Sequence, residues 1–111
     1  MPSNEAIGAV NKEAARIATQ RVLDFVKPGG TLIGRPGDAA DVRMVPGGQQ
    51  AAVNAYNYLT VGGAPYTGSY PGTMVVLPGG IYVGIRTNRD GLPTVDVNLP
   101  DKLGSVRFHY E

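Results

Sequence analysis

The chain contains no cysteine and only one histidine among its 111 residues. The absence of cysteine excludes disulfide scaffolds, thiolate zinc sites and cysteine nucleophiles, and one imidazole leaves too few soft ligands for a transition-metal site. We therefore expect chemistry that uses no metal and no cofactor. The length is typical of one domain, so we predict a single domain over residues 1–111.

The sequence also lacks a hydrophobic run of the roughly 20 residues needed to span a bilayer. Its N-terminus lacks the basic start and apolar stretch of a signal peptide. We expect no membrane anchoring by this domain, and export would require an address in another segment. Because the net charge is only +1, binding to phosphates would depend on a few placed arginines rather than on bulk attraction.

Helical periodicity marks the N-terminal part of the chain. Apolar residues three and four positions apart predict one helix over residues 4–27 and a second over residues 49–59. Between them, residues 28–48 hold three prolines and six glycines, which predicts a long loop with a short strand at 42–45. Residues 66–72 are a turn-rich connector.

Alternation of apolar residues marks the C-terminal part. It predicts four strands, over residues 73–77, 81–87, 94–99 and 105–110. Their short links favour antiparallel neighbours. We therefore predict an α+β fold in which N-terminal helices, from residues 1–72, pack on the apolar face of a four-stranded antiparallel meander sheet, from residues 73–111.

The same alternation turns five polar side chains to the other face of the sheet, namely Arg86, Thr94, Asp96, Arg107 and His109. Together they can hold a phosphate and move a proton. His109 should point outward, where an imidazole can act as a general acid or base near neutral pH. Asp96 could orient this imidazole. Gly84 would leave the face bare beside Arg86, so that a ligand could approach closely.

These groups fit transesterification of RNA, in which the 2′-hydroxyl attacks the neighbouring phosphorus and no metal is needed. His109 would exchange protons with the 2′-oxygen or the leaving 5′-oxygen. Arg86 and Arg107 would stabilise charge on the phosphoryl oxygens, and Thr94 would donate a hydrogen bond to one of them. Tyr66, Tyr70 or Tyr82 could stack an unpaired base.

Three segments near the C-terminus carry a family resemblance: Val76–Thr87 (VLPGGIYVGIRT), Leu92–Asn98 (LPTVDVN) and Val106–Tyr110 (VRFHY). In this order they resemble the C-terminal toxin domains of bacterial polymorphic toxins, the effectors of contact-dependent growth inhibition and of Rhs or YD-repeat proteins. The resemblance implies a ribonuclease, commonly one that cleaves transfer RNA. It also implies the fold shared by barnase, EndoU, the colicin ribonucleases and RelE.

Carried over by position, the resemblance marks Arg86, Thr94, Asp96 and His109 as catalytic. It puts Arg107 where the family tends to have lysine. Relatives often show a serine-rich spacer at residues 87–90, so we expect this loop to influence substrate choice. The expected RNA-binding residues are Arg107, Tyr82, Thr87 and Arg89.

The resemblance has biological implications as well. Such a domain is part of a larger secreted or surface-delivered effector of interbacterial competition, and it acts in the cytoplasm of the target cell. A cognate immunity protein blocks the site in the producing cell. RNA and this immunity protein are therefore the expected partners.

Two other interpretations stay open. In an NAD-cleaving toxin, the arginines would hold the pyrophosphate. In a non-enzymatic module that binds protein or nucleic acid, Arg86 and Asp96 would form a cross-strand ion pair without a catalytic role.

Overall fold

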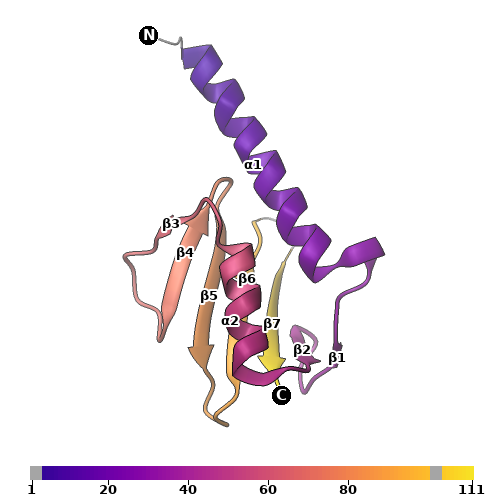
Figure 1. Cartoon of the computed structure of the whole chain (residues 1–111). Coiled ribbons are helices and arrows are strands. Elements are labelled where there is room, and N and C mark those ends of the chain that lie inside the picture. Colours follow the sequence, from indigo (N-terminus) through magenta and orange to yellow (C-terminus); the bar gives the residue numbers. More distant parts are fainter. Residues whose placement is uncertain (1–3, 101–103) are drawn as a thin grey trace.

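The computed structural model describes residues 4–100 and 104–111. These residues form two α-helices, α1 (Asn4–Val26) and α2 (Gly48–Leu59), a short 3-10 helix η1 (Pro28–Gly30) and one sheet (Figure 1). The strands are β1 (Arg35–Pro36), β2 (Val42–Val45), β3 (Ala64–Pro65), β4 (Thr73–Leu77), β5 (Ile81–Thr87), β6 (Pro93–Asn98) and β7 (Ser105–Tyr110). The α+β class is confirmed, as are both helices, the short strand β2 and the four C-terminal strands.

The sheet is larger than predicted. Its seven strands run in the order β1-β2-β7-β6-β5-β4-β3. Strands β4 to β7 form the expected antiparallel meander, but β2 pairs with β7 in parallel, with Val42 opposite Arg107. The prediction of a four-stranded, wholly antiparallel sheet was therefore wrong. A parallel pair needs a long connection, so its two strands lie far apart in the sequence and local periodicity does not reveal their pairing.

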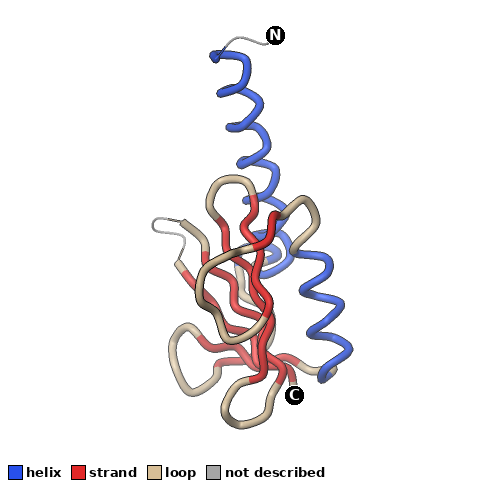
Figure 2. The backbone as a smooth tube through the Cα atoms, turned by 90° about the vertical axis from the view of Figure 1, so that its left-hand side faces the viewer, coloured by secondary structure: helices blue, strands red, loops and turns tan. Residues whose placement is uncertain are grey.

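The apolar residues of the meander form the core beneath α2. The inward-facing side chains that are buried are Leu77, Ile81, Val83, Val95, Val97, Val106, Phe108 and Tyr110. Helix α2 contributes Ala52, Ala55 and Leu59 to the same cluster. The apolar residues alternate as predicted in β5, β6 and β7, although β6 also buries Thr94 and Asp96 on its opposite side. Both helices lie on one side of the sheet, which leaves its other face without a helix (Figure 2).

Among the side chains that the structure describes, those of helix α1 are fully buried only in its C-terminal turns, although Ala15 also lies beside Gly79. Val22 and Val26 are buried, whereas Ile17, on the same predicted apolar stripe, is 53% exposed. Phe25 stacks on Tyr58 of α2 with ring centroids 5.1 Å apart. The N-terminal half of the helix extends beyond the sheet (Figures 1 and 2). The expectation that the whole first helix packs on the sheet was thus wrong for that half.

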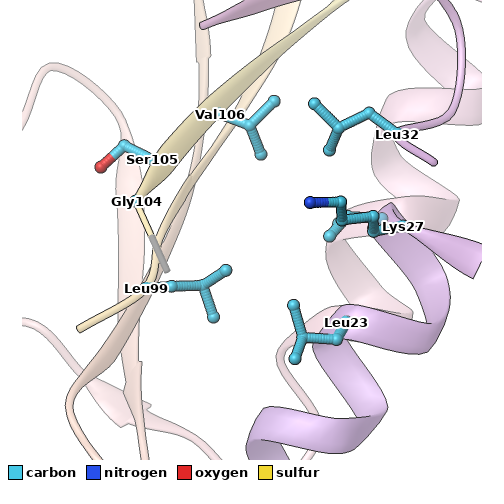
Figure 3. A pocket seen from close by; sticks show the side chains of 8 residues that line it. Leu23, Lys27, Leu32, Leu99, Gly104, Ser105 and Val106 are labelled. Atoms are coloured by element: carbon cyan, nitrogen blue, oxygen red, sulfur yellow. The ribbon is translucent and has the colours of Figure 1, made fainter. Parts of the chain in front are cut away.

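A small cavity remains where the end of α1 meets the sheet. It has a volume of about 190 Å³. Leu23, Lys27 and Leu32 lie on one side of it, and Leu99 and Val106 lie on the other (Figure 3). Because packing is open here, the attachment of α1 depends mainly on its fully buried valines.

Removing one of these valines should therefore loosen α1. We expect Val22→Ala to lower the free energy of unfolding by roughly 2 kcal/mol, since it leaves a cavity in the core. Ile17→Ala, on the same helix, should change it by less than about 0.5 kcal/mol, because that side chain is largely in solvent. Urea unfolding of both variants measures the difference. Equal losses would show that α1 docks along its whole length.

A second prediction concerns alkaline pH. Burial raises the pKa of Tyr110 to about 12, whereas an unfolded tyrosine ionises near pH 10. Between these values the unfolded chain has lost a proton that the folded chain retains, so stability should fall as the pH rises from about 10 towards 12. In Tyr110→Phe this decline should be shallower. Urea unfolding at several alkaline pH values tests this, and an unchanged slope would contradict it.

Candidate active site

Strand register brings the five predicted polar residues to one face of the sheet. In the ladder, Thr94 of β6 lies between Arg86 of β5 and His109 of β7. Two residues further along β6, Asp96 lies opposite Arg107 of β7. The shared face predicted from alternation is therefore present, with the residues on three adjacent strands.

A polar cavity of about 350 Å³ opens on this face. It is lined by Asp38, Arg86, Asn88, Arg89, Asp90, Arg107 and His109. Four of these were predicted from the sequence: Arg86, Arg89, Arg107 and His109. They come from β5, from the β5–β6 loop and from β7, so the fold gathers three guanidinium groups and the only imidazole around one space.

Asp96 is the centre of a hydrogen-bonded network beside this cavity. Its Oδ2 accepts hydrogen bonds from Arg86 Nε and from the Tyr70 hydroxyl, each at 2.7 Å. Its Oδ1 accepts a longer one from Arg86 Nη2, at 3.4 Å, and lies 3.9 Å from Arg107 Nε. The Asp96 side chain is only 11% exposed. The hydrogen bond to Asp96 also raises the pKa of Arg86, so this guanidinium stays charged.

The partners of Asp96 bear on two expectations, the orientation of His109 and the ion pair with Arg86. Among the described residues, the Asp96 carboxylate bonds to Arg86 and Tyr70, and not to His109, so it does not orient the imidazole as predicted. The ion pair between Arg86 and Asp96, considered above as an alternative to catalysis, is present.

Thr94 lies beneath the surface of the polar face. Its side chain is completely buried, and its hydroxyl donates to the carbonyl oxygen of Leu92 at 3.2 Å. In this arrangement Thr94 ties the β5–β6 loop to β6. Thr94 and Asp96 are therefore covered although they lie on the polar face, and Thr94 does not have the free hydroxyl predicted for a phosphoryl oxygen.

The bare place expected beside Gly84 is occupied by Tyr70. A Cβ atom built on Gly84 would lie 2.5 Å from Tyr70 Cζ. Burial, together with the hydrogen bond to Asp96, raises the pKa of the Tyr70 hydroxyl above its ordinary value. Tyr70 thus remains a hydrogen-bond donor, and the glycine accommodates a side chain of the protein itself.

Two of the predicted RNA-binding residues are not brought to the cavity. Tyr82 is partly exposed and packs edge-to-face on Tyr66, with ring centroids 5.6 Å apart. Thr87 lines a different hollow, between the end of β5 and α2, together with Gln49 and Val53. The cavity itself therefore brings together only Arg89 and Arg107 of the four predicted RNA-binding residues.

Sequence reasoning missed Asn88, which shapes the β5–β6 loop. Its Oδ1 accepts hydrogen bonds from the backbone N–H groups of Asp90 and Leu92, both at 2.9 Å. The available signal was the Asn-Arg-Asp-Gly sequence, since asparagine stabilises turns by bonding to backbone groups shortly after it. This turn carries Arg89 to the cavity.

Carboxylates around the cavity were also missed. Asp38 lines it from the loop before β2, and Asp41 Oδ2 lies 3.7 Å from Arg107 Nε. Both arrive through the pairing of β2 with β7, which no local pattern indicated. Together with Asp90, these carboxylates balance much of the positive charge of the three arginines at the cavity. An anion would therefore be attracted to individual guanidinium groups and not to the cavity as a whole.

In the part of the chain that the structure describes, no cluster of three or more histidine, cysteine, aspartate or glutamate residues is placed to hold a metal ion. Neither α1 nor α2, over their described residues, has the length and hydropathy of a membrane span.

Comparisons with protein-family models, curated proteins and solved structures find no match to the chain. Its function has to be inferred from the side chains that meet at the cavity.

Loss of the central carboxylate should destabilise the fold. Asp96→Ala leaves Arg86 without its buried partner, and we expect it to lower the free energy of unfolding by roughly 3 kcal/mol. The matched control is Arg35→Ala, which removes the exposed ion pair with Glu111 and should cost less than about 1 kcal/mol. Urea unfolding compares the two, and similar small losses would mean that the network contributes little.

Proposed function

We propose that this chain is a metal-independent endoribonuclease toxin domain that cleaves RNA by transesterification, with transfer RNA as the expected substrate. The observation that supports this best is the cavity on the polar face, where Arg86, Arg107 and His109 lie together. The resemblance of residues 76–110 to polymorphic toxin domains points to the same class of reaction. In this class the substrate's own 2′-hydroxyl is the nucleophile.

The arginines provide the binding of the phosphate. The Arg107 side chain is 54% exposed, so its guanidinium can turn towards a ligand and bind phosphoryl oxygens in bidentate fashion. Arg86 is held by Asp96 through Nε and Nη2, which fixes the direction of the rest of its guanidinium. A mobile and a fixed cation would together stabilise the negative charge that develops on phosphorus oxygens in the transition state.

The imidazole provides the proton transfer. As the 2′-oxygen attacks, the bond from the 2′-oxygen to phosphorus forms and the bond to the 5′-oxygen breaks. His109 takes the proton of the 2′-hydroxyl or gives a proton to the leaving 5′-oxygen, and water carries out the other of these two transfers, so that the downstream fragment ends in a 5′-hydroxyl. The product is a 2′,3′-cyclic phosphate. Because Thr94 is buried, we assign the phosphoryl contacts to the arginines and a supporting role to Thr94.

The biological setting in this proposal follows from the family resemblance. The domain would be delivered as part of a larger effector and act in the cytoplasm of a competing bacterium. A cognate immunity protein would protect the producing cell. The larger effector and the immunity protein are proposed on the resemblance alone.

One observation favours a second candidate. Arg86 and Asp96 form a short, largely buried ion pair, as expected if the pair serves the structure of a non-enzymatic binding module. Such a module would bind RNA or protein at the cavity without turnover.

Expression of the chain in bacteria without a protective partner tests the proposal. We expect growth arrest and fragmentation of RNA, and His109→Ala should lower the cleavage rate by about 10²-fold or more. Arg107→Ala should also lower it, whereas Arg16→Ala, on the exposed surface of α1, should not. Arg86→Ala is less useful, because it also leaves Asp96 buried without its main partner.

The ends of the RNA fragments provide the decisive measurement. A 2′,3′-cyclic phosphate on the upstream fragment supports transesterification. Growth arrest with intact RNA and loss of NAD would instead support an NAD-cleaving toxin. If the chain binds RNA without cleaving it, and His109→Ala leaves this binding nearly unchanged, the result would support the binding module.

A further inference from the structure

The connector between β3 and β4 lies against the candidate site. Tyr70, near its end, places its hydroxyl 2.7 Å from Asp96 Oδ2 and its ring over Gly84. At the start of the connector, the Tyr66 backbone N–H donates to the Met74 carbonyl at 2.9 Å. The Tyr66 ring packs on Tyr82. The connector is therefore attached at both ends to the strands that carry the polar face.

We propose that Tyr70 is a positioning residue, which fixes the Asp96 carboxylate and through it the guanidinium of Arg86. The catalytic consequence of this inference rests on the ribonuclease function proposed above. The contact itself, and its effect on Arg86, can be measured without that function.

The geometry explains why a second donor is needed. Oδ2 of Asp96 accepts from both Tyr70 and Arg86 Nε, while Oδ1 has only the longer bond from Arg86 Nη2. A carboxylate bonded to Arg86 alone can turn about its Cβ–Cγ bond, and the guanidinium can turn with it. The Tyr70 hydroxyl approaches from a different element, the connector, so it restricts this rotation. Arg86, which lines the cavity, is then held in one direction.

Gly84 supports the same assignment. It is buried, and its φ is not in the left-handed region where the structure has ten other glycines. The backbone therefore does not require glycine at this position. The space does, because a Cβ would lie 2.5 Å from Tyr70 Cζ and 2.6 Å from the hydroxyl oxygen. An alanine here should push the phenol away from Asp96.

Tyr70→Phe is the direct test, because it removes only the hydroxyl. We expect kcat for RNA cleavage to fall on the order of tenfold through misplacement of Arg86, with KM changed by less than about twofold. In an Asp96→Asn background the same substitution should have little further effect, since the two groups act as one unit. Tyr66→Phe, on the same connector but away from Asp96, is the matched control and should leave kcat unchanged.

An NMR measurement gives a readout that does not depend on activity. The Nε–H signal of Arg86, identified by its loss in Arg86→Lys, should be protected from solvent exchange in the original chain. It should exchange faster in Tyr70→Phe and stay protected in Tyr66→Phe.

A second pair of variants covers the role of Gly84. Gly84→Ala should expose the Arg86 Nε–H and lower kcat in the same way as Tyr70→Phe. In a Tyr70→Ala background, where the ring is absent, Gly84→Ala should have little additional effect on stability or on exchange. Additive effects of the two substitutions would show that Gly84 is required for a reason other than Tyr70.

The outcomes separate this inference from the proposed function. If His109→Ala abolishes cleavage while Tyr70→Phe leaves both kcat and the Arg86 signal unchanged, the positioning role is overturned and the ribonuclease stands. If no RNA is cleaved by the original chain but the Arg86 signal changes as expected, the ribonuclease is overturned and the contact between Tyr70, Asp96 and Arg86 stands.

Discussion

The burial of alternate residues in β6 and β7 is the constraint on which the polar face depends. Val95, Val97 and Phe108 are held in the core beneath α2, each contributing about 1.5 to 3 kcal/mol by leaving water. Since side chains alternate along a strand, a shift of one residue would expose all three and turn Asp96 into an apolar interior. An unpaired carboxylate there would cost several kcal/mol more. Both terms act in the same direction, so one register is strongly preferred.

This constraint also explains how much of the molecule could be predicted from the sequence. The alternating runs of β5 and β7 defined the bounds of these strands, and together with the run of β6 they placed Arg86, Thr94 and His109 on one face. What they could not show was which side chains cover that face. Tyr70 reaches it from a connector without periodicity, and β2 joins β7 from a distant loop, so neither contact leaves a local pattern. The docking of α1 by its end rather than its length was hidden for a similar reason, since an apolar stripe does not show how far its partner surface extends.

The arginines illustrate why composition alone does not identify a phosphate site. Arg43 donates hydrogen bonds to the carbonyl oxygens of Ile33 and Gly34, and so holds the segment before β1. Arg86 is paired with the buried Asp96, whereas Arg107 is about half exposed and lies 3.7 Å from the exposed carboxylate of Asp41. The three arginines thus have three different surroundings. Only the fold distinguishes an arginine that supports a loop from an exposed arginine that can contact a ligand. The roles of these three arginines became clear only after each had been placed on its strand.

The place of β7 inside the sheet has a consequence for the order in which the molecule is built. Arg86 and Asp96 sit on strands joined by a short loop, so their contact is local and can form early. His109 lies on a strand that must be enclosed by β6 on one side and by the remote β2 on the other, and contacts between distant segments form slowly because a long loop has to close. A nascent or partly unfolded chain would then hold Arg86 in place before Arg107 and His109, which both lie on β7, have reached their positions, so the polar face is complete only when the last ladder has formed.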